Sequence, residues 1–256
     1  MHTMKRLFPA LLALGCSAAL ALAQLPLGGL GAAPTPDPRF DANFALLLGA
    51  HQAFSADMEY AVLDAEKKPV NVVPGKLAYL ESKSRFEIDM SQVRGLGAVS
   101  EMAAQLKIMG LADLVMIRRP DKSLKYLVYP GLGSYVEEKL TDKPADPAAK
   151  TRSKKETTEI GQETLEGHPC VKTRVVVTDD TGHRLEATLW NATDLKQFPL
   201  RIEMLEDGKT TTRLFKNVRL AKPDAALFEP PASLARYESI GAMMQGFLMK
   251  SMGVGK

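Results

Sequence analysis

The tripeptide His168-Pro169-Cys170 is the one place where a base and a thiol stand close together in the sequence. A thiolate activated by a neighbouring imidazole is a catalytic nucleophile, so cysteine chemistry is one hypothesis for this segment. The alternative is structural, because Gly167 and His168 before a proline favour a turn between two strands. Cys170 then enters the core as a small hydrophobic residue. No third group nearby orients the imidazole, so the turn is the preferred interpretation.

Other chemistry has weaker support. The histidines outside the first residues of the chain show no paired spacing typical of metal ligands, and they are His51, His168 and His183. The adjacent acids Asp179 and Asp180 suggest a carboxylate pair or a calcium site, but their place before Thr181-Gly182 is typical of a hairpin turn. We therefore expect no catalytic residue, no metal and no cofactor, and we predict that the protein is not an enzyme.

Charge and motifs weaken the case for three further classes of function. The net charge is +3 from 33 basic and 30 acidic side chains, which gives no electrostatic basis for binding nucleic acid. Ser134 lacks the Gly-x-Ser-x-Gly setting of a hydrolase, and no glycine-rich loop suited to phosphate precedes a basic residue. These patterns count against hydrolase and nucleotide-binding functions.

The N-terminus predicts export. Lys5 and Arg6 precede an apolar run over residues 7–22, which ends in a small-x-small pattern at Ala23. We expect a signal peptide over residues 1–23 and a periplasmic mature chain that begins near Gln24. Lipid attachment at Cys16 is the alternative, but residues 17–23 remain apolar where a lipidated start more often turns polar. No second apolar run reaches the roughly 18 residues that cross a bilayer.

After the signal, a Gly, Pro and Ala-rich leader over residues 24–39 precedes a single domain over residues 40–256. Asp37-Pro38 predicts a helix start, with the apolar positions Phe40, Phe44, Leu47 and Leu48 on one helical face. A second helix is predicted over residues 99–109. A third, methionine-rich helix is predicted near the C-terminus, with Leu234, Tyr237, Ile240, Met244, Phe247 and Leu248 on one side.

Strands dominate the rest of the chain. Apolar and polar residues alternate around Met58 and around Phe86, which indicates strands with one buried and one solvated face. A hairpin is predicted from residues 114–117 to 126–129, followed by an exposed basic loop over residues 141–155. Further hairpins are predicted between 157 and 215, two of them with Gly182 and Gly208 in their turns. The pattern predicts an α+β fold, mainly β: a long antiparallel meander with a few helices on one face.

With these elements in this order, the chain resembles the periplasmic lipoprotein-carrier superfamily of the LolA and LolB type. The matching stretches are 52–58, 75–77 leading to 84–86, 116–121 leading to 135, 161–164, 167–172, 190–192, 198–200 and Phe228-Glu229-Pro230-Pro231. The resemblance implies a curved sheet forming an incomplete barrel, with helices packed on the concave face over an apolar cavity for acyl chains. It also implies an arginine that helps hold the closed state, and Arg85 is the matching position. The basic loop and the methionine-rich final helix depart from the carriers.

An antiparallel sheet with one apolar face provides a pocket for an apolar ligand if helices do not fill it. The candidate lining residues are Met58, Tyr60, Tyr79, Phe86, Ile88 and Trp190. A one-residue change of register would move each side chain to the opposite face.

Two functions follow from these residues and the resemblance. The first is a non-catalytic carrier, expected to be a monomer, that binds a lipid or other apolar ligand, with a lipoprotein acyl chain as one candidate. The second is an interaction or sensory module of the same fold, whose partners would be membrane-anchored envelope proteins. A filled interior would favour the second function.

Overall fold

The computed structural model describes residues 38, 40–95, 103–140, 154–178, 182, 184–206 and 208–251. The chain divides into two units, Met1–Thr35 and Pro36–Lys256, and every described residue lies in the second unit. The predicted signal peptide, Cys16 and almost all of the leader lie outside the described residues. Most of the predicted basic loop lies outside them too, as do Asp179, Asp180 and His183.

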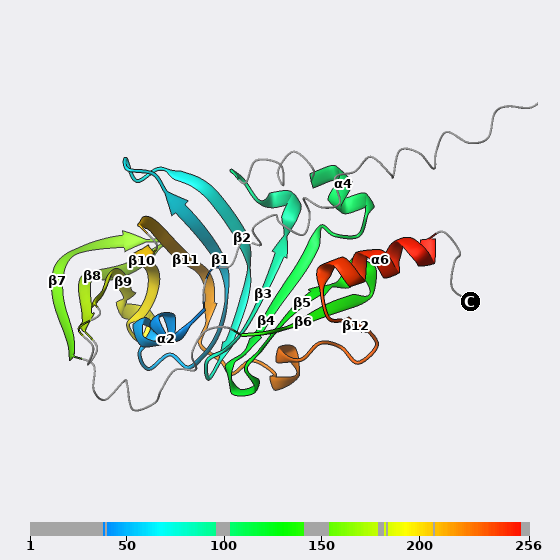
Figure 1. Cartoon of the computed structure of the whole chain (residues 1–256). Helices are drawn as coiled ribbons and strands as arrows, with labels where there is room; N and C mark the ends of the chain where they lie inside the picture. Colours follow the sequence, from blue (N-terminus) through cyan, green and yellow to red (C-terminus); the bar gives the residue numbers. More distant parts are fainter. Residues whose placement is uncertain are drawn as a thin grey trace, which may run out of the picture. The chain divides into compact units, whose positions relative to one another are not determined.

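Twelve strands form one sheet in the order β12-β6-β5-β4-β3-β2-β1-β11-β10-β9-β8-β7. Neighbouring strands are antiparallel, except for the short β12, which runs parallel to β6. The sheet curves and stays open, with β12 and β7 at its two ends, which confirms the predicted incomplete barrel (Figure 1). The strands are β1 (Ala53–Leu63), β2 (Pro69–Leu80), β3 (Lys83–Asp89), β4 (Asp113–Arg119), β5 (Leu124–Tyr129), β6 (Ser134–Lys139), β7 (Lys154–Leu165), β8 (His168–Thr178), β9 (Arg184–Ala192), β10 (Phe198–Glu206), β11 (Lys209–Arg219) and β12 (Ala235–Tyr237).

Most strands pair with the strand that follows them in the chain, as the predicted meander requires. The exceptions are two long-range contacts. One joins β1 to β11, with Tyr60 opposite Arg213, and the other joins β12 to β6. A single ladder between β1 and β11 therefore links the six strands of the first half to the five strands of the second.

The sheet has an inner and an outer face. The inner face carries Phe54 and Tyr79 and is covered by helix α2 (Ala42–Leu48), which lies inside the curve (Figure 1). The outer face carries a second core, where Phe228 packs against residues of β2, β4 and β5. The expectation of one solvated face, made for the strands around Met58 and Phe86, holds along β3. β4, predicted only as one strand of a hairpin, has no solvated face over residues 114–118, which are all buried.

The helices differ from the predictions at their ends. Helix α2 begins after Asp41, whose carboxylate accepts a hydrogen bond from the backbone N–H of Phe44 at 3.0 Å, and not at Asp37-Pro38. Helix α4 is described over Ala103–Ile108, and residues 99–102 of the predicted helix lie outside the described residues. Helix α6 covers Ile240–Ser251, and the predicted position Tyr237 lies in β12 instead, because residues 235–237 pair with the edge of β6.

Candidate functional site

Aromatic side chains from α2 and from the strands β1, β2 and β11 meet on the inner face. Phe44 of α2 lies 5.7 Å from Tyr79 and 6.3 Å from Phe215, measured between ring centroids. Phe54 packs against both Tyr79 and Phe215, at 5.5 and 5.9 Å. None of these rings is more than 1% exposed, so the space directly beneath α2 is filled by the protein's own side chains. Such edge-to-face pairs stabilise the packed arrangement beyond the burial of apolar area.

A fully buried arginine fastens the segment that leads into α2. Arg213 of β11 is 0% exposed, and its Nε and Nη2 atoms donate to the backbone carbonyl of Pro38 at 2.9 and 2.5 Å. Nη2 also pairs with the carboxylate of Glu206 at 2.9 Å. The guanidinium lies over the rings of Tyr60 and Phe44, 5.4 and 5.8 Å from their centroids. We call the contact of Arg213 with Pro38 and Glu206 the Arg213 latch.

Asp41 adds a second polar group close to the latch. Burial raises the pKa of its carboxyl, while the hydrogen bond from Phe44 and the charge of Arg213 act in the opposite direction. Asp41 and Arg213 thus hold the two sides of the turn into α2. The helix is tied by polar contacts at its start and by apolar contacts along its length.

Sequence reasoning did not single out Arg213, although a signal was present. In the predicted strand over residues 210–215, alternation places Arg213 on the same side as Phe215, which is an apolar position. An arginine at an inward position of a strand needs partners, because a buried charge is costly without them. Glu206 is seven residues away across the same hairpin, but Pro38 is 175 residues away, so only the tertiary structure supplies this second partner.

The structure brings together four of the proposed lining residues. Met58, Tyr79, Phe86 and Ile88 are at most 2% exposed and lie on the inner face of three adjacent strands. Tyr60 lies on the same face and contacts the Arg213 latch. The alternation that predicted the strands around Met58 and Phe86 therefore also gave the orientation of these side chains.

The other two proposed residues lie on the outer face. Arg85 is opposite Ala78 and Ile117, both members of the outer core, and its Nε pairs with Glu87 at 2.8 Å. Trp190 alternates with Leu189, which belongs to the row of Ile202 and Arg213 on the inner face. Instead, the side chains of Lys172 and Arg201 lie over the Trp190 ring, 4.6 and 4.7 Å from the ring centroid. The two residues are thus not joined to the inner group.

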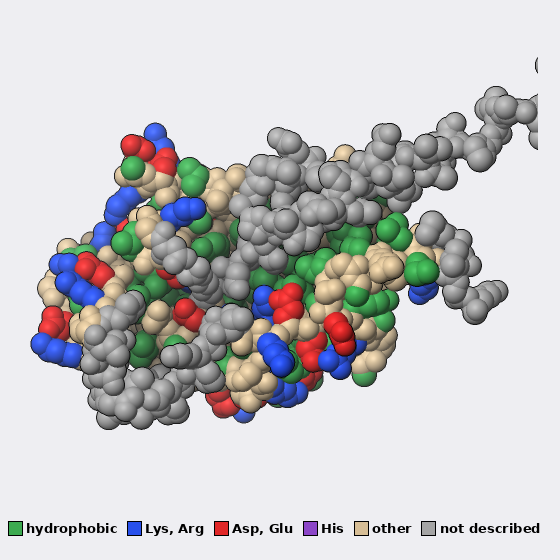
Figure 2. All heavy atoms as spheres, viewed as in Figure 1, with side chains coloured by type: hydrophobic (Ala, Val, Ile, Leu, Met, Phe, Trp, Pro, Cys, Tyr) green, Lys and Arg blue, Asp and Glu red, His purple; other side chains and the backbone are tan. Residues whose placement is uncertain are grey.

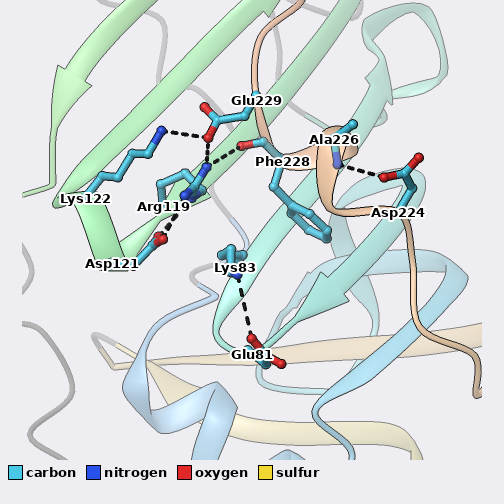
Figure 3. Close-up of polar contacts among 9 residues, drawn as sticks. All are labelled: Glu81, Lys83, Arg119, Asp121, Lys122, Asp224, Ala226, Phe228 and Glu229. Atoms are coloured by element: carbon cyan, nitrogen blue, oxygen red, sulfur yellow. Dashed lines mark hydrogen bonds and ion pairs between the residues drawn. The ribbon is translucent and has the colours of Figure 1, made fainter.

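Arg85 and Arg119 hold the segment that crosses the outer face. Arg85 donates to the carbonyl of Leu227 at 3.2 Å, and Arg119 donates to the carbonyl of Phe228 at 3.3 Å. Figure 3 shows Arg119 between the carboxylates of Asp121 and Glu229, with Phe228 pointing away from this network. We call residues 225–229 the outer strap. Arg85 therefore contacts this strap rather than α2.

A pocket of about 290 Å³ lies beside the outer strap, and its lining includes Arg85, Lys76, Arg219 and Leu227. A second pocket of about 530 Å³ continues along β1, β2 and β3 and shares Lys76 with the first. Charges of opposite sign alternate across the strands here, because Asp57 pairs in register with both Lys76 and Lys216. These outer pockets are charged at their rims and differ in character from the apolar inner face.

The thiol of Cys170 is not arranged for catalysis. It is 2% exposed, burial raises its pKa, and its Sγ donates to the backbone carbonyl of His168 at 3.4 Å. The ring of His168 instead contacts Asp194, with Nδ1 2.8 Å from a carboxylate oxygen. Asp194 is the orienting group that the sequence did not reveal. Because the thiolate is disfavoured, the turn interpretation explains this segment better than nucleophilic catalysis does.

Two further absences concern only the described parts of the chain. Within them, no three His, Cys, Asp or Glu side chains are grouped so that they could hold a metal ion. Among the helices of those same parts, none has the length and apolar character that crossing a membrane requires.

Comparisons with known proteins give structural neighbours only. No family model matches the sequence, and a search of curated proteins finds no match. MucB in complex with MucA(peri), a pair also solved from Pseudomonas aeruginosa, is 16% identical to this chain, with a TM-score of 0.37. The similarity covers 76% of this chain and 61% of MucB, so the chain spans about three fifths of that protein.

Two further solved structures are similar over nearly their whole length. LprF from Mycobacterium bovis is 14% identical, with a TM-score of 0.39, over 72% of this chain and 96% of LprF. A LolA superfamily protein from Nitrosomonas europaea is 7% identical, with a TM-score of 0.34, over 71% of this chain and 91% of that protein. At these identities no residue role passes from one protein to another. A LolA superfamily protein is thus among the solved structures to which the chain is similar.

Proposed function

We propose that this protein is an exported, non-catalytic envelope protein that binds a lipid or other apolar ligand on the inner face of its open sheet. One observation carries the proposal. A continuous apolar face of a curved sheet is covered by a helix of only seven residues, α2, and one buried arginine fastens the segment before that helix. The export signal predicted over residues 1–23 supports a periplasmic location for this activity.

Ligand entry on this face requires α2 to move, because aromatic side chains fill the space beneath it. The helix buries three large side chains, Phe44, Leu47 and Leu48. Their burial is worth about 1.5–3 kcal/mol each, or about 5–9 kcal/mol together. An acyl chain that takes their place gains about 0.8 kcal/mol per methylene, so about six to eleven methylenes are needed to displace the helix. The proposed ligand is therefore a long acyl chain rather than a short or compact apolar molecule.

The first test is the mass of the protein purified gently from the exported fraction. Intact mass is measured under native and then denaturing conditions, and a mass that is lost on denaturation and identified as a lipid supports the proposal. The second test removes the lipid and titrates the protein with fatty acids of 8 to 18 carbons. We expect affinity to rise steeply between about 8 and 13 carbons, because shorter chains do not offset the displacement of α2.

Matched variants test whether binding depends on the inner face or is weakened by any added carboxylate. Val62→Asp places a carboxylate on the inner face at a half-buried position beside Tyr60, and should weaken binding of a 16-carbon chain at least tenfold. Ile160→Asp makes the same change on the exposed edge strand β7, where Ile160 is 49% exposed, and should leave binding unchanged. Equal affinity of Val62→Asp and the wild type would contradict the inner face as the binding site.

A second function, an interaction module, is favoured by one observation. The interior beneath α2 is filled, and β7 presents a 12-residue edge strand whose side chains are almost all exposed. An extended segment of an envelope protein would add to this edge by backbone hydrogen bonds. If the native mass equals that of the protein alone and no acyl chain binds, these results support the interaction module instead of the lipid carrier.

A further inference from the structure

Three polar side chains lie side by side on the inner face, in one row that crosses adjacent strands. Tyr79 of β2 is opposite Ser84 of β3, and Ser84 is opposite Arg118 of β4. Tyr79 and Ser84 are 1% exposed, and Arg118 is 6% exposed. We call these three residues the polar row. Burying polar groups is costly unless they find partners, so this row needs an explanation.

Two hydroxyl groups of the polar row have no partner in the described part of the chain. Within that part, neither Tyr79 Oη nor Ser84 Oγ makes a hydrogen bond, although both atoms are shielded from solvent. Burial raises the pKa of Tyr79 and Ser82 acts in the opposite direction, so Ser82 lies nearby without completing a hydrogen bond. Each hydroxyl can donate one hydrogen bond. A ligand with two acceptor oxygens would therefore satisfy both groups.

The charges around the polar row balance while α2 is in place. Lys125 follows Arg118 in the same row, but its Nζ pairs with the carboxylate of Glu138 at 2.9 Å. In the Arg213 latch, the guanidinium is already paired with a carboxylate. Asp41 is the remaining acid, and its pKa is raised by burial and lowered, among smaller causes, by the charge of Arg118. Arg118 and Asp41 therefore act on each other across the start of α2.

Displacement of α2 would uncover the polar row. Phe44 of α2 packs on Tyr79, with 5.7 Å between the ring centroids. Phe40, just before the helix, packs on Phe86 of β3 at the same distance. Asp41 caps α2, so its carboxylate moves away when the helix does. A ligand that displaces α2 then meets the two hydroxyl groups and a buried cation from which the internal carboxylate has departed.

The next row of the inner face is entirely apolar. It crosses β1 to β6 in register, and all its side chains are buried: Ala56, Leu77, Phe86, Met116, Leu127 and Val136. The polar row flanks the turns after β2 and β4, and Figure 2 shows basic and acidic side chains at the surface around the turn after β4. The inner face thus offers polar groups beside an apolar strip, which suits a ligand with a polar head and an apolar chain.

We propose that the ligand is a long-chain carboxylic acid whose carboxylate is held by the polar row. Tyr79 and Ser84 donate hydrogen bonds to its two oxygens, and Arg118 supplies the opposite charge. The head group takes the place of the Asp41 carboxylate, which is the same chemical group with the same charge. This inference rests on the proposed function, because it names the head group of the acyl ligand proposed there.

The test is titration of the exported protein, freed of lipid, with dodecanoate and with methyl dodecanoate at pH 8. The acid is ionised at this pH, whereas the ester carries the same chain without a charge. We expect the wild type to bind dodecanoate about tenfold or more tightly than the ester, because hydrogen bonds to a charged group are the stronger ones. The double variant Tyr79→Phe/Ser84→Ala should lower dodecanoate affinity about tenfold or more and ester affinity less than about threefold.

Tyr126→Phe is the matched control, because Tyr126 is 5% exposed but belongs to the outer core. It removes the same hydroxyl group from the opposite face and should leave both affinities unchanged. Unfolding of the lipid-free variants in urea gives a second readout. Ser84→Ala should keep or raise the wild-type midpoint, because its hydroxyl group has no partner to lose in the described residues. A midpoint lowered by about 0.5 M or more would show that this hydroxyl is already paired and would overturn the proposal.

The same titrations distinguish this inference from the proposed function. Equal affinity of the wild type for the acid and the ester would overturn the polar row as a head-group site and leave acyl-chain binding intact. The same conclusion follows if the double variant keeps the wild-type preference for the acid, or if Tyr126→Phe loses as much of it. Failure of the wild type to bind either probe would instead overturn the proposed function, and this inference with it.

Discussion

Removing the guanidinium of Arg213 should destabilise the fold more than any surface charge change. In Arg213→Ala, the carbonyl of Pro38 loses two hydrogen bonds and the carboxylate of Glu206 loses its buried partner. Hydrogen bonds to charged groups contribute about 1.5–3 kcal/mol each, and breaking a buried ion pair costs about 3–5 kcal/mol. Because the Glu206 side chain keeps 12% exposure, water relieves part of this cost. We expect the free energy of unfolding to fall by about 3–4 kcal/mol, a large share of the roughly 5–15 kcal/mol that is typical of folded proteins.

The assay is unfolding in urea at pH 7, from which the midpoint and the slope of the transition are measured. Arg213→Lys keeps the charge but cannot donate in two directions with the same geometry, so its loss of unfolding free energy should be about half as large. Arg174→Ala is the control, because Arg174 pairs with Glu186 at 2.6 Å and its side chain is 50% exposed. Such an exposed pair contributes little to stability. If Arg213→Ala loses no more stability than Arg174→Ala, the latch does not hold the segment before α2 and the reasoning is refuted.

Four further outcomes follow from the geometry. Phe228→Ala should cost about 3–5 kcal/mol in urea unfolding, because Phe228 is 0% exposed in the outer core, and a loss below 1 kcal/mol would contradict that role. Gly75→Ala should also destabilise, by about 1–3 kcal/mol, since an added Cβ would lie 2.4 Å from the carbonyl of Glu87; an unchanged midpoint would exclude this clash. Cys170 should react with an alkylating reagent at pH 7 only after unfolding, and rapid labelling of the folded protein would revive the catalytic hypothesis. Asp121→Asn should lower stability at pH 7, and by less as the pH falls below 3.8: the hydrogen bond from Arg119 lowers the pKa of Asp121 from that ordinary value, so its stabilising effect is fully present above the unfolded pKa and is lost as the pH falls through the folded value. A destabilisation at pH 2 as large as that at pH 7 would oppose this.

Local patterns predicted the strands and the inner residues well, for physical reasons. Alternation around Phe86 fixes both the strand and the face of its side chain, because successive residues of a strand point to opposite sides. The turn at residues 120–122 was also predicted, since proline with charged residues favours such turns. These features depend on neighbours in sequence.

Features that depend on distant segments could not be predicted in the same way. The outer core forms because residues 225–229 cross back over strands β2 to β5. The sequence of β4 has no periodicity that would indicate that both of its faces are covered. Arg85 was assigned through the family resemblance to the closed state, whereas here it contacts Leu227 of the outer strap. Trp190 was expected in the lining, but a single register step places it among Lys172 and Arg201. Both side chains have partners that only the tertiary structure brings near.

The ladder between β1 and β11 has a consequence for the order of folding. Each half of the sheet is a series of hairpins between neighbouring strands, which form quickly because their ends are close in sequence. The β1–β11 ladder instead joins residues about 150 apart, such as Tyr60 and Arg213, so it forms only after β11 has emerged. During N-to-C synthesis or translocation, the edge of β1 that pairs with β11 stays unpaired until the second half is completed. A chaperone that binds this unpaired edge would protect the nascent protein from aggregation.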